Sequence, residues 1–168
     1  TVSIGTRSHP YERLAKAAAE PVRQLSEELR CQVNLAVLHG ERRVMLCYHL
    51  NPAARRPWDH FIFSDHWMTA TGRLLIASLE DRDARKIVSS IGIRPYPKAE
   101  LDKIRADGFT VFPEGALSVM GHLIQAPGYP AAAFGFGVPK QNEKYAFERS
   151  AATAETIRRK LSMQNKAY

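Results

Sequence analysis

Two segments of this 168-residue chain have the alternating apolar pattern of antiparallel strands, and helical patterns separate them. Residues 31–50 alternate on both sides of a turn at His39-Gly40-Glu41, which predicts a β-hairpin. Residues 116–139 predict two more strands, joined across Ala126-Pro127-Gly128-Tyr129. Antiparallel strand pairs separated by helices favour an α+β layer fold over a doubly wound parallel sheet.

Helical spacing of apolar residues predicts the remaining elements. The expected helices are 9–30 with a kink or break at Pro21, 68–79, 78–91, 96–107 and 143–163. Gly108 is a stop signal for the fourth helix, and a short strand is expected over Phe109 to Phe112. We expect a central antiparallel sheet with the two terminal helices on one face. The middle helices and a loop at 50–65 would cover a ligand pocket on the other face.

Composition limits the environment of the chain. Apolar residues make up 45% and charged residues 24%, and no apolar run approaches the ~18 residues that cross a membrane. The two cysteines, Cys31 and Cys47, are too few for a disulfide framework and are expected at core strand positions. We therefore expect a soluble, reduced, cytoplasmic protein. Its net charge of +7 is spread from Arg7 to Lys166 among acidic residues, which favours a solvated surface over a nucleic-acid interface.

Four stretches resemble the effector-binding domain of the IclR-type bacterial transcriptional regulators. Residues 31–50 resemble the hairpin Thr-Val-Asn-Leu-Ala-Val-Leu of that family, and residues 66–79 its Leu-His-Ala-Thr-Ala-Leu-Gly-Lys-Ala-Leu-Leu-Ala segment. Residues 100–111 resemble its helix Glu-Leu-x-x-Ile-Arg-x-x-Gly-Tyr-x-Val, and residues 116–139 resemble its closing hairpin. The resemblance covers about residues 10–162.

This resemblance implies a GAF-like fold and a role in sensing. Residues 10–168 would be the effector-binding domain and residues 1–9 a linker remnant, because nine residues leave no room for the winged helix-turn-helix of the family. The resemblance implies that a small organic acid is bound, that the domain forms a homo-oligomer (dimer or tetramer), and that operator DNA is contacted only through the missing N-terminal domain. Neither catalytic activity, a cofactor nor a membrane partner is expected.

The start of the helix at 68–79 is the first candidate for effector binding. By position, the backbone groups of Ala70 and Thr71 would hold the effector carboxylate, and Gly72 would let backbone and ligand approach closely. The alternative is that Thr69 or Thr71 only caps the helix, with Gly72 permitting close packing.

Other positions bear on the choice of ligand. Ser118 matches a pocket Cys of many family members, and Gly135 and Gly137 match serines, so a larger and less polar pocket is expected at that end. Trp67 and Met68 replace smaller or imidazole side chains. We therefore hypothesise an aromatic or otherwise bulky carboxylate effector. The aromatic residues nearby are Phe61, Phe63, Phe134 and Phe136, and ordinary core packing is the alternative for each. The acidic residues of the family's loop before Ser118 are missing at matching positions, although Glu114 is close.

Three other functions remain open. Asp59-His60 and Asp65-His66, with His49 or His122, suggest a metal site, but their spacing matches no closed metal motif. A thiol or redox enzyme would need Cys31 or Cys47 activated, and apolar strand positions disfavour a thiolate. Alanine-rich faces at 17–19 and 151–154 suit an oligomerisation module with a degenerate ligand site, or packing on the domain's own sheet.

Overall fold

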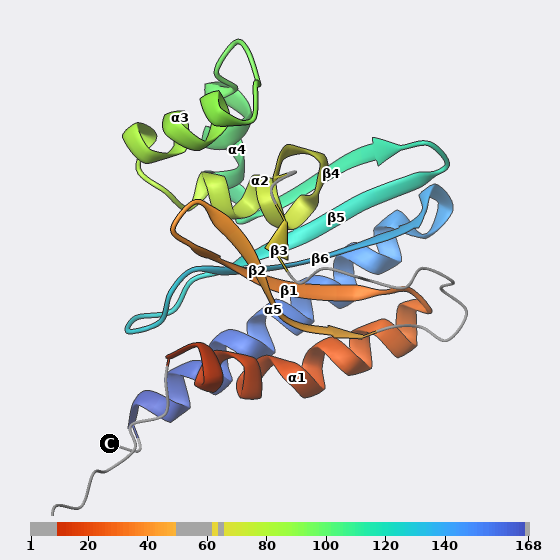
Figure 1. Cartoon of the computed structure of the whole chain (residues 1–168). Coiled ribbons are helices and arrows are strands. Elements are labelled where there is room, and N and C mark those ends of the chain that lie inside the picture. Colours follow the sequence, from red (N-terminus) through yellow and green to blue (C-terminus); the bar gives the residue numbers. More distant parts are fainter. Residues whose placement is uncertain (1–9, 50–61, 64–65, 167–168) are drawn as a thin grey trace, which may run out of the picture.

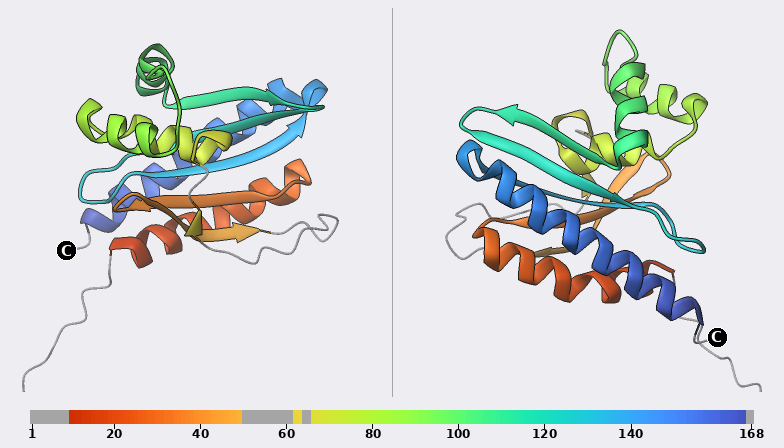
Figure 2. Two further views of the ribbon diagram at one scale, coloured as in Figure 1. Left: turned by 45° about the horizontal axis from the view of Figure 1, so that its top comes forward. Right: turned by 180° about the vertical axis from the view of Figure 1, so that it is seen from behind.

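The fold consists of one antiparallel sheet between two layers of helices (Figures 1 and 2). The structure is a computed structural model, and it describes residues 10–49, 62–63 and 66–166. Nearly all of the loop expected at 50–65, and the linker remnant expected at 1–9, lie outside these residues.

The elements follow the order that the sequence predicts. They are α1 (Pro10–Leu29), β1 (Val33–His39), β2 (Arg42–His49), β3 (Ile62–Phe63), a 3-10 turn η1 (His66–Met68), α2 (Ala70–Ala77), α3 (Asp81–Ser90), α4 (Lys98–Asp107), β4 (Phe109–Glu114), β5 (Leu117–Ile124), β6 (Ala132–Pro139), a 3-10 turn η2 (Lys140–Asn142) and α5 (Glu143–Lys166). Strand β4 is two residues longer than expected, because its pairing with β5 continues to Glu114 opposite Leu117.

The described strands form one sheet in the order β3-β2-β1-β6-β5-β4, and each neighbouring pair is antiparallel. Both predicted hairpins are confirmed. Gly40 makes the first turn with a φ of 62°, a left-handed conformation that glycine adopts without steric cost. The β1–β2 pairing is shifted by a bulge between Leu35 and Ala36.

Helices α1 and α5 lie side by side on one face of the sheet, as Figure 2 shows from behind. Their apolar faces join the inward side chains of β1, β5 and β6 in the larger core, which includes Leu14, Val22, Leu25, Val33, Leu35, Val37, Met120, Phe134, Ile157 and Leu161. Pro21 neither ends nor breaks α1, which continues to Leu29 with Pro21 buried. Ala17, Ala18 and Ala154 are buried in this core, so these alanines pack on the domain's own sheet.

Helices α2, α3 and α4 cover the opposite face, as predicted. Here α2 lies on β5 and β6, and α3 and α4 pack outside it around a second core that includes Leu74, Leu75, Ile76, Ile87, Leu101 and Ile104. Gly108 ends α4 with a φ of 65°, and its carbonyl accepts a 2.9 Å hydrogen bond from the Leu123 N–H. No helix in the described part of the chain is long and apolar enough to cross a membrane.

Candidate functional site

The start of α2 is capped by its own sequence. Thr69 is the N-cap, and its Oγ1 accepts a 3.1 Å hydrogen bond from the Gly72 N–H. The Arg73 N–H bonds to the Thr69 carbonyl at 3.2 Å, as the first bond of the helix. Within the described residues, no acceptor is bonded to the N–H groups of Ala70 and Thr71. Thr69 therefore caps the helix, as the alternative interpretation of this segment predicts. The cap does not use the N–H groups of Ala70 and Thr71, which can bond to a group beyond the helix end.

Three glycines, which carry no side chain, let α2 lie close to η1, β5 and β6. A Cβ on Gly72 would lie 1.7 Å from the His66 carbonyl oxygen, so Gly72 serves packing against η1. A Cβ on Gly121 would lie 2.5 Å from the Phe134 carbonyl oxygen and 3.1 Å from the Ala70 Cβ. A Cβ on Gly135 would lie 3.2 Å from the Thr71 Cγ2. The first turn of α2 is thus seated on the backbones of β5 and β6.

Next to this turn is a cavity of about 330 Å³ that is open to solvent on one side. Its lining comes from five strands or strand ends and from the start of α2: Gln32, Asn34, Arg43, Met45, Met68, Thr69, Ala70, Thr71, Glu114, Leu117, Val119, Gly135, Phe136 and Gly137. The size is within the ~300–1,000 Å³ of small-molecule sites, and a six-membered ring fits into it. Most of the surface is apolar, with a few polar groups between the apolar side chains.

The structure brings five of the eight predicted site residues to this cavity: Met68, Ala70, Thr71, Gly135 and Gly137. Met68 is 63% exposed at the rim. Side chains at 135 and 137 would point toward α2 and Leu117, so their absence widens the cavity.

Three predicted residues lie outside the lining. Ser118 faces the terminal helices, where its hydroxyl donates a hydrogen bond to Glu143 of α5. Gly72 packs against η1, as described above, and not against the cavity. Trp67 packs against the second core, and its ring lies 4.9 Å from the Arg73 guanidinium carbon.

The aromatic residues divide between core and cavity. Phe134 is fully buried on the side of the terminal helices, with its ring stacked 5.4 Å from His122, so core packing explains it. Phe136 belongs to the same core but also reaches the cavity lining. The side chains of Phe61 and Phe63 lie outside the described residues. Glu114 lines the cavity from β4, although it does not match the position of any acidic residue in the loop of the family.

Arg73 holds the wall formed by η1. Its Nε donates a 2.7 Å hydrogen bond to the Trp67 carbonyl, and its Nη1 donates one of 2.7 Å to Glu100 of α4. The guanidinium carbon lies 3.6 Å from the centre of the Phe112 ring on β4. One arginine of α2 thus connects η1, α4 and β4 beside the cavity.

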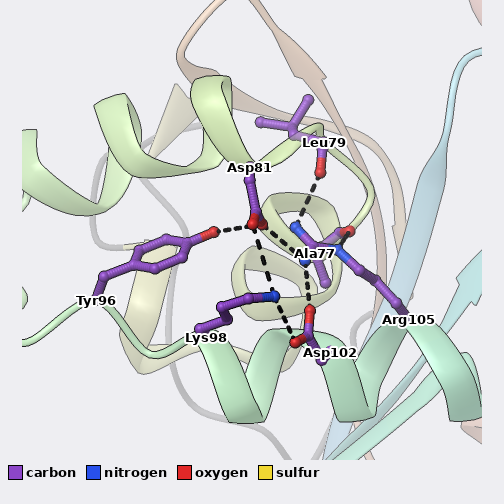
Figure 3. A network of polar contacts seen from close by, with 7 residues as sticks. All are labelled: Ala77, Leu79, Asp81, Tyr96, Lys98, Asp102 and Arg105. Carbon is purple, nitrogen blue, oxygen red and sulfur yellow. Dashed lines mark hydrogen bonds and ion pairs between the residues drawn. The ribbon is translucent and has the colours of Figure 1, made fainter.

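A polar network fixes the far end of α2 (Figure 3). Arg105 of α4 donates to the carbonyls of Ala77 and Leu79 at 2.9 and 3.0 Å, and to the carboxylates of Asp81 and Asp102. The hydrogen bonds from Tyr96 and Arg105 lower the pKa of Asp81. Arg105 therefore connects α4 to the end of α2 and to the start of α3, so the network is a structural clamp for these three helices.

Of the groups considered for metal or thiol chemistry, those within the described residues do not gather into a site. Within the described residues no three His, Cys, Asp or Glu side chains cluster as metal ligands would, and Asp59, His60 and Asp65 lie outside them. His122 lies 2.8 Å from the Ser150 hydroxyl under α5. Burial raises the pKa of Cys31 to about 12 and that of Cys47 to about 11, which suppresses the reactive thiolate.

Sequence reasoning missed several residues of the cavity, among them the charged residue Arg43. Its side chain is 4% exposed, and its Nη1 donates a 2.6 Å hydrogen bond to the Thr71 Oγ1. The available signal was the alternation of β2, because Arg43 and Met45 share the face turned toward α2 while Val44 faces the terminal helices. A charged residue in phase with an inward strand position indicates a partner inside the fold.

Comparison with solved structures identifies the fold of this chain. No protein-family model and no curated protein match this sequence. An IclR homolog from Microbacterium hydrocarbonoxydans, solved with 4-hydroxybenzoate, superposes with a TM-score of 0.76 at 19% identity, over 94% of this chain and 71% of that one. IclR of Thermotoga maritima gives 0.69 at 18% identity, over 88% and 68%.

A third structure covers a single domain. It is the C-terminal domain of a Vibrio cholerae protein assigned as a transcriptional regulator, with a TM-score of 0.70 at 16% identity over 92% of this chain and 99% of that one. The chain therefore has the fold of the C-terminal domains of IclR-type regulators, as the sequence resemblance predicts.

Proposed function

We propose that this chain is the ligand-sensing domain of an IclR-like transcriptional regulator, and that the cavity beside α2 binds a small organic acid. The observation that carries the proposal is the cavity itself. The first-turn N–H groups of α2 and the guanidinium of Arg43 meet an apolar space large enough for a ring.

The chemistry of the lining favours an acid with an apolar body. The start of a helix attracts negative charge, while Met45, Leu117 and Val119 offer apolar contact. Met68 at the rim adds a flexible side chain that adapts to the shape of a ligand. An aromatic acid meets both requirements, and the Microbacterium homolog of the same fold was solved with one, 4-hydroxybenzoate.

Ligand binding would regulate DNA binding by changing the arrangement of the subunits. A ligand that binds one arrangement of subunits better than another shifts the equilibrium between them. In the parent protein this shift would change how the N-terminal domains meet operator DNA, in the cytoplasm. The chain acts in this scheme by binding and not by catalysis.

Thermal unfolding against a small panel tests the sensor function. A ligand that binds only the folded state stabilises it by RT ln(1 + [L]/Kd), about 2.7 kcal/mol at a hundredfold excess over Kd. For a domain of this size that corresponds to a rise of roughly 5–10 °C in the midpoint. The panel is 4-hydroxybenzoate, benzoate, pyruvate and 4-hydroxybenzamide. A rise with the aromatic acids and none with the amide supports an acid sensor, whereas equal midpoints with all four contradict it.

A further inference from the structure

One uncharged polar side chain of the cavity lies on β1, and we infer that this residue, Asn34, binds the acid group of the ligand. The Nδ2 of its side-chain amide donates to an oxygen of the ligand's carboxylate. The inference rests on the proposed function. It assigns to a strand of the sheet the recognition of the group that distinguishes an acid from its neutral analogues.

The sheet turns Asn34 toward α2. Along β1 the side chains of Val33 and Leu35 lie in the core under the terminal helices, and that of Ala36 lies in the core around α2. Because successive side chains of a strand point to opposite faces, Asn34 shares the face of Ala36. It also belongs to the cavity lining. The amide therefore stands on the side of the sheet that the cavity occupies.

The neighbour of Asn34 in the sheet leaves room for a ligand. Asn34 pairs directly with Gly135 of β6, and such partners lie about 5 Å apart with their side chains on one face. Gly135 has no side chain to fill the space beside the amide. A Cβ at Gly135 would lie 3.3 Å from the Ala70 Cβ and 3.2 Å from the Thr71 Cγ2. Asn34 is therefore one strand away from the place where β6 contacts the first turn of α2.

A hydrogen bond decides which end of the amide is available. The Gln32 Nε2 donates to the Asn34 Oδ1 at 2.9 Å, so the Asn34 oxygen already has a donor. Among the residues that the structure describes, none accepts a hydrogen bond from the Asn34 Nδ2. This nitrogen carries two N–H donors, and a carboxylate only accepts hydrogen bonds. The amide therefore offers the cavity the kind of group that an acid requires.

The alternative role of Asn34 is structural, in which its bond with Gln32 only orders the start of β1. A structural role changes the stability of the fold and the binding of all ligands to a similar degree. Donation to a carboxylate affects an acid far more than molecules of the same shape without the acid group. Ratios of affinities therefore separate the two roles.

The test measures Kd by calorimetry for 4-hydroxybenzoate, 4-hydroxybenzamide and 4-methylphenol. Asn34→Asp keeps the shape of the side chain and an acceptor for Gln32, but it replaces the two donors by a negative charge. It should weaken binding of the acid about 100-fold, because like charges repel each other at short distance. The amide should keep its affinity within about threefold, because its NH₂ group donates to the introduced carboxylate.

Asn34→Leu is the second variant, and it removes the donors at nearly the same volume. It should weaken binding of the acid about 10-fold, without weakening that of 4-methylphenol. Asn142→Asp is the matched control. It makes the same exchange at an exposed residue of η2 outside the cavity lining, and it should leave all three affinities unchanged.

The outcomes separate the inference from the proposed function. If wild type binds the acid, an equal change for acid and neutral compounds in either folded variant, or no change, would overturn the role of Asn34 and leave the sensor function in place. A wild-type chain that binds none of the three compounds would overturn both. If circular dichroism shows that Asn34→Asp does not fold, the comparison of 4-hydroxybenzoate with 4-methylphenol in Asn34→Leu decides alone.

Discussion

Arg43 on β2 and Thr71 in the first turn of α2 share a 2.6 Å hydrogen bond, although 28 residues separate them in the chain. The bond connects a strand near one edge of the sheet to the helix that covers its middle. The methyl group of the same threonine lies against Gly135 of β6. The Thr71 side chain therefore positions α2, β2 and β6 relative to one another. A change in any of these elements should alter the positions of the other two.

Gly135→Ala should reduce both ligand binding and stability relative to Gly137→Ala. A methyl group at 135 would lie 3.2 Å from the Thr71 Cγ2 and 3.3 Å from the Ala70 Cβ, whereas one at 137 has its nearest contact at 3.5 Å. Glycine in a strand otherwise costs about 0.5–1 kcal/mol relative to alanine, so Gly137→Ala should be neutral or stabilising. Urea unfolding and ligand titration of the two variants check this difference. Equal stability and equal binding in both would mean that Gly135 does not set the spacing between β6 and α2.

Thr69→Ala should destabilise the domain by about 1 kcal/mol, because the cap of α2 at the Gly72 N–H is lost. Thr69→Ser keeps the accepting oxygen and should recover most of that loss. Thr156→Ala is a matched control, since Thr156 is a threonine inside α5 whose hydroxyl bonds only to the Ala152 carbonyl. Midpoints of chemical denaturation measure all three. If Thr156→Ala lowered the stability as much as Thr69→Ala, loss of the cap would not be the cause of the destabilisation.

Arg105→Ala should loosen α2, α3 and α4 from one another and lower the free energy of unfolding by about 2 kcal/mol. The reason is that this side chain satisfies the carbonyls of Ala77 and Leu79 and contacts Asp81 (Figure 3). Arg82→Ala is the control, because Arg82 is an exposed arginine whose side chain is 82% accessible. Hydrogen exchange of the α3 amides should rise in the first variant only, and unchanged exchange would contradict the clamp.

His122 makes the fold sensitive to mild acid. Burial, with a smaller effect from Arg158, lowers the pKa of His122 from 6.5 to about 4. Between these values the unfolded chain binds a proton that the folded chain does not, so the free energy of unfolding falls as the pH drops from about 6.5 to about 4. Below pH 4 this contribution stays constant.

The loss attributable to His122 is up to about 3 kcal/mol, and urea unfolding at several pH values measures it. His122→Phe removes the titrating group and keeps a ring among Phe109, Phe134 and Phe147. The decline between pH 6.5 and 5 should disappear in that variant, since carboxylates such as Asp81 and Asp102 titrate at lower pH. A decline of the same slope in wild type and variant would contradict this assignment.

Periodicity and turn residues predicted the fold because they act locally. The alternation around Gly40 and the stop at Gly108 depend only on residues close in the chain, and both occur where the sequence places them. The effect of Pro21 could not be predicted, because packing of α1 against α5 and β1 decides whether a proline inside a helix is tolerated.

The site could be predicted only in part. Ala70, Thr71, Gly135 and Gly137 line the cavity, and their contact with a ligand stays a prediction. Ser118 lies outside the cavity lining, because the orientation of β5 points its hydroxyl toward Glu143 of α5, on the opposite face of the sheet. Arg43 was missed because its importance depends on contact with Thr71, and a contact over 28 residues is not visible in local spacing.

Chemical shift mapping is the most direct test of an acid-binding site beside α2, because it reports both whether a ligand binds and where. The measurement is a titration of the ¹⁵N-labelled chain with 4-hydroxybenzoate, and with 4-hydroxybenzamide as the neutral control. We predict saturable shifts in the backbone amides of Ala70, Thr71 and Gly135 with the acid, with those of Asp81 and Asp102 unchanged. The absence of shifts at the start of α2, or shifts centred on α1 and α5, would contradict an acid-binding site in this cavity.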